Sequence, residues 1–388
     1  MSGPSLKFRV LILLGLLAAT ASAGTVEEEA ARAVDLFYDL QFDAAFRAAQ
    51  ELDGKYPDSP AGLFYLSVAY YQRYLLEDPP SENTISQFWK TSDQALAKAV
   101  KLEKQAPALS HYYQGGILGF QARELVAQKR YARAIPKARQ AANHLTKALE
   151  LDPSLVDAKL GLGLYYYFLD RLPSAAKPIA RLMIGMWGDR AKGLAYLREA
   201  AQKGGAGRRE VESILAAIAA SQWEQNWTEA QTLLTGLVKA YPHNPRFRLS
   251  LVYVYQRQGR WLLAAETADP EGSWIAGLDP FVKARAEELA RYRAAENWLF
   301  ADRWQEAVIQ LDRIESGAVT NGLQDWVALR RGNALDAQGR PADAGSYYSL
   351  IRDQKAKALA EQFQITPFPA GPRDVMPNRW PLSNIPGQ

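Results

Sequence analysis

The chain repeats a pattern of apolar residues, and two copies start 34 residues apart, at Trp227 and Trp261. From Trp227 the pattern continues with Ala230, Leu234 and Leu237 and closes with Pro242. The same steps are found at Phe42, Ala45, Ala49, Leu52 and Pro57, and again at Ala138, Ala141, Leu145, Ala148 and Pro153. A period of this length predicts a solenoid of paired α-helices, because each unit buries its apolar face only by stacking on its neighbours.

A second set of matches follows each closing proline. Three segments share a leucine, a small residue or valine, and a tyrosine at the same offsets: Leu66, Ser67 and Tyr70; Leu162, Gly163 and Tyr166; Leu251, Val252 and Tyr255. A small residue on a helix face lets two helices approach closely. Because helix-forming residues dominate and no alternating strand pattern interrupts them, we expect an all-α fold of antiparallel helix pairs.

These motifs resemble the tetratricopeptide repeat (TPR). The pattern of that family has Trp, Leu-Gly and Tyr on one helix and Ala, an aromatic residue and Pro on the next. Leu162-Gly163 with Tyr166, and Trp261 with Ala264, carry it here. The resemblance spans residues 26–364 and implies a TPR-like superhelical solenoid. The segment from Trp187 to Arg190 is also faintly similar to the inclusion-body-clearance repeat family, but one short match carries no function.

The spacing of the repeats is irregular. Trp261 to Trp304 is 43 residues and Phe42 to Trp89 is 47, so several connections are lengthened. We expect extra helices or loops within residues 78–84, 117–134 and 171–189. The glycine-rich stretch at residues 204–207 predicts a joint between N-terminal repeats at 24–203 and C-terminal repeats at 208–365.

A proline-rich tail, residues 366–388, follows the last repeat. Its prolines are Pro367, Pro369, Pro372, Pro377, Pro381 and Pro386. Proline lacks the amide donor of a helix, so the tail is expected to be extended. Phe368 and Trp380 are the side chains expected to hold it on the last repeat.

The N-terminus has the layout of a cleavable secretory signal peptide, residues 1–23. Lys7 and Arg9 precede an apolar run, and Ala21-Ser22-Ala23 offers a cleavage site after Ala23. The alternative is an uncleaved anchor, but the run of ten apolar residues is too short for a hydrocarbon layer of about 30 Å. The chain has no cysteine, which excludes disulfides, thiol catalysis and an acylated N-terminal cysteine. We expect an exported protein, in a bacterial periplasm or secreted.

The sequence carries no recognisable catalytic motif. Its histidines, His111, His144 and His243, have no second ligand at metal-binding spacing. Residues 204–209 lack the Lys-Ser/Thr ending of a phosphate-binding loop, which favours an ordinary interhelical loop. The net charge of +4 is small for nucleic-acid binding. We therefore expect a protein that is not an enzyme, with no metal, no cofactor and no nucleic-acid partner.

The TPR resemblance implies a groove lined by the first helix of each repeat, which receives a protein or peptide partner. The positions transferred from the family as partner-binding are Phe64, Val68, Tyr71, Gln72, Leu164, Tyr167, Tyr253, Gln256 and Arg257. Because most are apolar or aromatic, an apolar or amphipathic segment is the expected ligand, and the Lys and Asn of a carboxylate clamp are missing. In the alternative interpretation, inserted helices or the proline-rich tail fill this groove internally.

The sequence supports three functional hypotheses. The first is a non-catalytic scaffold or adaptor that mediates protein–protein interaction in the bacterial cell envelope. The second is a binder of glycan or anionic envelope polymer, through surface aromatics and a basic helix face at Lys129, Arg130, Arg133, Lys137 and Arg139. The third is an enzyme whose site the sequence does not reveal.

Overall fold

The structure is a computed structural model that describes residues 26–77, 80–172, 174, 177–184, 187–315 and 323–378. The chain divides into two compact units, residues 1–212 and 213–388. The expected signal peptide and Trp380 lie outside the described residues. No helix in the described ranges has both the length and the apolar character needed to cross a membrane.

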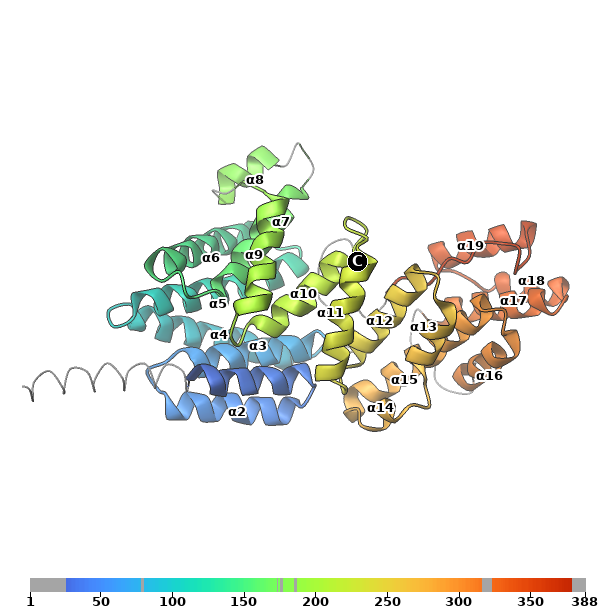
Figure 1. Ribbon diagram of the computed structural model, residues 1–388, viewed down its shortest axis with the longest axis horizontal. Coiled ribbons are helices and arrows are strands. Elements are labelled where there is room, and N and C mark those ends of the chain that lie inside the picture. Colours follow the sequence, from blue (N-terminus) through green and yellow to red (C-terminus); the bar gives the residue numbers. More distant parts are fainter. Residues whose placement is uncertain are drawn as a thin grey trace, which may run out of the picture. The chain divides into compact units, whose positions relative to one another are not determined.

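The N-terminal unit is built of helices joined mostly by short loops (Figure 1). A helix over residues 26–38 comes first. It is followed by α2 (Phe42–Lys55), α3 (Ala61–Tyr74), α4 (Glu82–Leu102), α5 (Pro107–Ala127), α6 (Tyr131–Leu151), α7 (Ala158–Asp170), α8 (Lys177–Ile184), α9 (Arg190–Lys203) and α10 (Arg208–Ala219). The division between the units falls within α10.

The C-terminal unit continues the same pattern. Its helices are α11 (Trp227–Ala240), α12 (Pro245–Arg257), α13 (Trp261–Ala268), α14 (Ser273–Ala276), α15 (Pro280–Phe300), α16 (Trp304–Glu315), α17 (Gln324–Ala337), α18 (Pro341–Tyr348) and α19 (Gln354–Ile365). Consecutive helices pack in pairs, such as α11 on α12, α15 on α16 and α17 on α18. Short loops between packed neighbours make these pairs antiparallel. The described chain is thus an all-α, TPR-like array, as the sequence predicts.

The repeated apolar positions form the core of each pair. On α11, Ala230, Leu234 and Leu237 are buried, and Phe42, Ala45, Ala49 and Leu52 are their counterparts on α2. The side chain of Asn226 accepts a hydrogen bond from the Glu229 amide at 3.2 Å and so caps the start of α11. The buried apolar stripe and the end of each helix before the closing proline therefore follow from the repeated pattern, whereas the helix start does not, because α6 begins at Tyr131, ahead of Ala138.

Small residues on α7 and α9 allow close helix contact. A Cβ added to Gly193 would lie 2.7 Å from the Tyr167 amide nitrogen and 2.8 Å from the Gly163 carbonyl oxygen. Both distances are below van der Waals contact, so only glycine fits at residue 193. This confirms the close approach predicted from Leu162-Gly163.

The lengthened connections have different structural origins. Residues 171–189 include an extra helix, α8, as expected. Residues 117–134 do not project as an insertion: they are the end of α5, a short turn and the start of α6. The extra length there comes from α4, α5 and α6, each of 21 residues. Asp78 and Pro79, in the third expected insertion, lie outside the described residues.

The glycine-rich loop before α10 is held by a half-buried carboxylate. Asp157 accepts hydrogen bonds from the amides of Gly205 and Gly207, at 3.0 and 3.2 Å. Burial raises the pKa of Asp157, and the two amides act in the opposite direction. The amides that a phosphate-binding loop would offer to a ligand are therefore bonded to this side chain, in agreement with an interhelical loop.

Candidate functional site

A cluster of buried polar residues lies where α12, α15 and α17 face the tail. Gln256 comes from α12, Arg293 and Glu296 from α15, and Arg330 from α17. Each is buried, although charged side chains are seldom buried without a partner. We call these four side chains, together with Tyr292 beside them, the tail site.

Glu296 is the centre of the tail site. Its Oε1 lies 2.7 Å from Nη2 of Arg330, and its Oε2 lies 2.9 Å from Nη1 of Arg293. Gln256 donates to Oε2 at 2.7 Å, and the Tyr292 hydroxyl donates to Oε1 at 2.8 Å. Glu296 and Arg330 are both 0% exposed, so water does not compete for these bonds.

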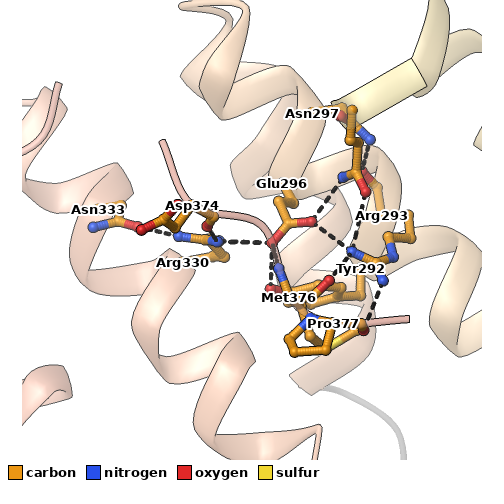
Figure 2. Close-up of polar contacts among 10 residues, drawn as sticks. Tyr292, Arg293, Glu296, Asn297, Arg330, Asn333, Asp374, Met376 and Pro377 are labelled. Carbon is orange, nitrogen blue, oxygen red and sulfur yellow. Dashed lines mark hydrogen bonds and ion pairs between the residues drawn. The ribbon is translucent and has the colours of Figure 1, made fainter. Parts of the chain in front are cut away.

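The tail completes this network with backbone atoms (Figure 2). The Met376 amide donates to Oε1 of Glu296 at 2.9 Å. Arg293 donates through Nη1 to the Met376 carbonyl at 2.9 Å and through Nη2 to the Pro377 carbonyl at 3.0 Å. Nη2 of Arg330 donates to the Asp374 carbonyl. An extended segment is thus recognised by one donor and three acceptors of its main chain.

Charge and burial explain why Glu296 stays ionised. Burial alone would raise the pKa of its carboxyl group, but Arg330, Arg293 and the Met376 amide together outweigh burial and lower it. Each guanidinium in turn needs acceptors, and tail carbonyls supply some of them. The tail and the tail site therefore supply hydrogen-bond partners for each other's buried polar groups, as such groups require.

Two side chains of the tail are buried in the C-terminal unit. Met376 is 0% exposed. Phe368 is 1% exposed and lies 6.1 Å from Phe300 and 6.2 Å from Phe363, measured between ring centroids. Because Phe363 belongs to α19, this confirms that Phe368 holds the tail on the last repeat. Residues 366–378 form no helix, as their prolines predict.

Further polar contacts flank these two anchors. The Phe368 amide donates to Asp336 at 3.3 Å, and the same carboxylate accepts from the Tyr348 hydroxyl at 2.6 Å. Arg373 pairs with Asp302 at 2.9 Å, and Asn378 donates to the Ser250 hydroxyl at 3.2 Å. The tail is therefore bound along its described length rather than at one point.

The structure places most of the expected partner-binding residues of the N-terminal unit in the core. Tyr71 and Tyr167 are 0% exposed, and Phe64 and Val68 are also buried. Their expected exposure to a groove is corrected here: α5 packs on α3 beside Phe64 and Tyr71, and α9 packs on α7, where Gly193 lies against Tyr167. The ring of Phe64 contacts Tyr113, and the rings of both Phe64 and Tyr71 contact Phe120.

Two other expected residues of this unit differ from that group. Gln72 is buried and donates at 3.0 Å to Glu210, which also pairs with Arg123. Leu164 is half-buried. In this unit, neighbouring helices of the array cover most of the positions transferred from the family.

The expected residues of the C-terminal unit lie in or beside the tail site. Gln256 is buried and binds Glu296, so its expected exposure is also corrected. Tyr253 is half-buried, with the guanidinium of Arg293 5.9 Å from its ring centre. Arg257 is exposed and lies over Trp227 at 5.5 Å. Contact of these residues with a partner stays a prediction, and the tail filling the groove is the arrangement that the structure has.

Sequence reasoning missed Arg293, Glu296 and Arg330. The available signal was charge at helical spacing on α15 and α17, but such residues are more often solvent-exposed. Their convergence requires the packing of two helices that are separate in sequence, α15 and α17, which no single segment reveals.

The histidines are far apart in the sequence, which gives no sign that two of them are in contact. In the structure, His111 and His144 form a pair with their Nδ1 atoms 2.8 Å apart. Within the described residues, no group of three or more histidines and carboxylates is arranged to hold a metal ion.

The chain matches no protein-family model and no curated protein. Among solved structures, a monomeric mutant of IFIT1 with Gppp-AAAA is similar over 88% of this chain and 86% of that chain. The two share 14% sequence identity, with a TM-score of 0.40. A likeness of that degree carries no argument about function, and function is inferred from the contacts within this chain.

Proposed function

We propose that this protein is a non-catalytic helical scaffold that binds a protein partner as an extended segment in the tail site. One observation carries the proposal: an extended stretch of the chain already lies there, bound through its backbone by Arg293, Glu296 and Arg330. Main-chain contacts are available in any peptide, so a site that uses them accepts sequences other than the tail.

The burial of the tail site adds to this support. Moving an arginine or a glutamate out of water costs several kcal/mol per ion in a real protein, and about 20 kcal/mol in the ideal dielectric limit. A buried ion pair therefore seldom makes a protein more stable than apolar packing would. Apolar residues would pack the same helices together at a lower cost in free energy. A polar network in which Arg293, Glu296 and Arg330 each bind a peptide group of the tail is better explained by recognition.

A labelled peptide with the sequence from Gly371 to Asn378 tests the proposal. In the full-length chain, Met376→Asp puts a carboxylate beside Glu296 and should release the tail, since like charges repel in a buried site. The matched control is Asp374→Asn, because that side chain is exposed and only its carbonyl is bound.

We expect the peptide to bind the Met376→Asp chain and to bind the Asp374→Asn chain at least about tenfold more weakly, because an attached tail competes at millimolar effective concentration. Equal, undetectable binding to both chains, with unchanged circular dichroism, would refute the proposed function.

A second candidate function has one observation in its favour. Lys129, Arg130, Arg133 and Arg139 are exposed beside the exposed Tyr131, and none forms an ion pair within the described part of the chain. Such a surface suits an anionic polymer. Retention on a polyanion matrix that is lost in an Arg130→Ala, Arg133→Ala chain would support it, and unchanged retention would remove this surface from consideration.

We also propose export, with cleavage after Ala23, as the setting of the scaffold. The layout of residues 1–23 supports it. Mass spectrometry of the chain recovered outside the cytoplasm should give a first residue of Gly24, and a chain that keeps Lys7 would contradict cleavage.

A further inference from the structure

We infer that the tail is an internal occupant of the tail site, and that the partner it excludes is an extended segment with an apolar residue followed by proline. This inference rests on the proposed function and specifies its ligand. It depends on which atoms of residues 374–377 are bound and which are left unused.

Glu296 selects the residue that stands at position 376. Its carboxylate accepts the amide hydrogen of Met376 at 2.9 Å, so the residue bound there must have an N–H. Proline is excluded at this position because it has no amide hydrogen. The Met376 side chain is fully buried, which adds the requirement for an apolar group.

Arg293 selects the backbone conformation at the same point. Its guanidinium binds two successive carbonyls, of Met376 and Pro377, at 2.9 and 3.0 Å. Two bonds from one planar group fix the spacing and direction of those carbonyls. The ligand therefore crosses Arg293 in one register.

Position 377 makes no use of an amide hydrogen. Pro377 contributes only its carbonyl to the described contacts, so the absence of an N–H has no cost there. Proline also holds the preceding residue in an extended conformation, which is the conformation of the bound segment. Proline after the apolar residue thus lowers the entropy lost on binding.

The side chains at positions 373 and 374 have no polar contact with the tail site. Arg373 and Asp374 are exposed, and only the Asp374 carbonyl reaches the tail site, at Arg330. Arg373 pairs with the exposed Asp302, outside the tail site, so the tail site itself requires neither side chain in a partner. The recognised pattern is accordingly a variable residue with a free carbonyl, one intervening residue, an apolar residue and proline.

Modified peptides test this pattern on the full-length Met376→Asp chain. An N-methyl group on the residue equivalent to Met376 removes the donor that Glu296 accepts, and should weaken binding by about tenfold or more. The matched control is an N-methyl group on the residue equivalent to Asp374, whose amide has no bond in the site. Replacing Met by Asp should also abolish binding, whereas Leu should be tolerated.

The outcomes separate the two proposals. If no peptide binds at all, the proposed function fails. If peptides bind but tolerate the N-methyl group or Asp at position 376, the function stands and this inference is overturned. Should Met376→Asp misfold, a wild-type chain with a fluorophore at its C-terminus gives a second test: excess peptide must lower its anisotropy, and the N-methylated peptide must not.

Discussion

Glu296 illustrates how a single residue connects folding to recognition. Its charge is tolerated in the interior only because two guanidinium groups and one tail amide surround it. Removing any of them leaves an uncompensated charge rather than a harmless gap. The effects of substitution should therefore be large and specific to this carboxylate.

Glu296→Gln should lower the free energy of unfolding by about 3–5 kcal/mol, because it leaves the buried Arg330 without its counter-ion. The control is Glu306→Gln, which breaks a pair between exposed side chains, Arg303 and Glu306, and should cost less than about 1 kcal/mol. Denaturant titration of both chains measures the difference. Equal losses would mean that the tail site contributes no more than a surface pair.

The lowered pKa of Glu296 predicts how this difference depends on pH. A folded-state pKa below the ordinary value of 4.5 means that the stabilisation is complete above pH 4.5 and is lost as the pH falls below it. The stability gap between wild type and Glu296→Gln should then be constant from pH 7 to 5 and narrow below 4.5. A gap that stays constant down to pH 3 would contradict the assignment.

At the scale of elements, the packing of helix pairs depends on a few contacts that the repeat pattern does not specify. One is the histidine pair between α5 and α6. Burial, then the charge of His111, lower the pKa of His144, while Glu103 acts in the opposite direction. A histidine held neutral in the folded state loses its stabilising contribution as the pH falls below its ordinary value of 6.5.

The wild-type chain should therefore lose more thermal stability between pH 7.5 and 5.5 than His144→Gln. The reason is that the unfolded chain gains a proton at residue 144 that the packed pair excludes. Melting curves at the two pH values measure this, with His243→Gln as the control for losing a histidine elsewhere. If His144→Gln and wild type lose the same stability, the pair does not couple packing to pH.

A second element-scale prediction concerns glycine. Gly193→Ala should destabilise the chain by about 1–3 kcal/mol, because the added methyl group meets backbone atoms of α7 that cannot move aside. Gly236→Ala is the matched control, since no atom lies within 4 Å of its added Cβ. That change should stabilise α11 by about 0.4–1 kcal/mol. Destabilisation by both would point to a general intolerance of helix substitution instead.

At the scale of the molecule, helix pairing could be predicted from sequence because it depends on local periodicity. Ala230, Leu234 and Leu237 recur at helical spacing, and burying them needs only a neighbouring helix. The accessible surface could not be predicted in this way. Tyr71 and Tyr167 lie on the face expected to be open, but the length and position of α5 and α9 decide whether that face is covered.

The candidate site was predictable only in outline. The prolines of the tail indicate an extended segment, and an internally filled groove is one interpretation of the sequence. The register of the tail depends on Arg293, Glu296 and Arg330, whose charges are typical of a solvated helix face when read one helix at a time. Only the packing of α15 on α17 brings these three side chains to one backbone segment.

Amide hydrogen exchange at Met376 in the wild-type chain tests the central claim most directly, namely that the tail occupies a backbone-reading site. An amide bonded to a fully buried carboxylate should exchange far more slowly than in an unstructured chain. Excess unlabelled peptide from Gly371 to Asn378 should then speed its exchange by displacing the tail. Exchange at the unstructured rate without peptide would contradict the account.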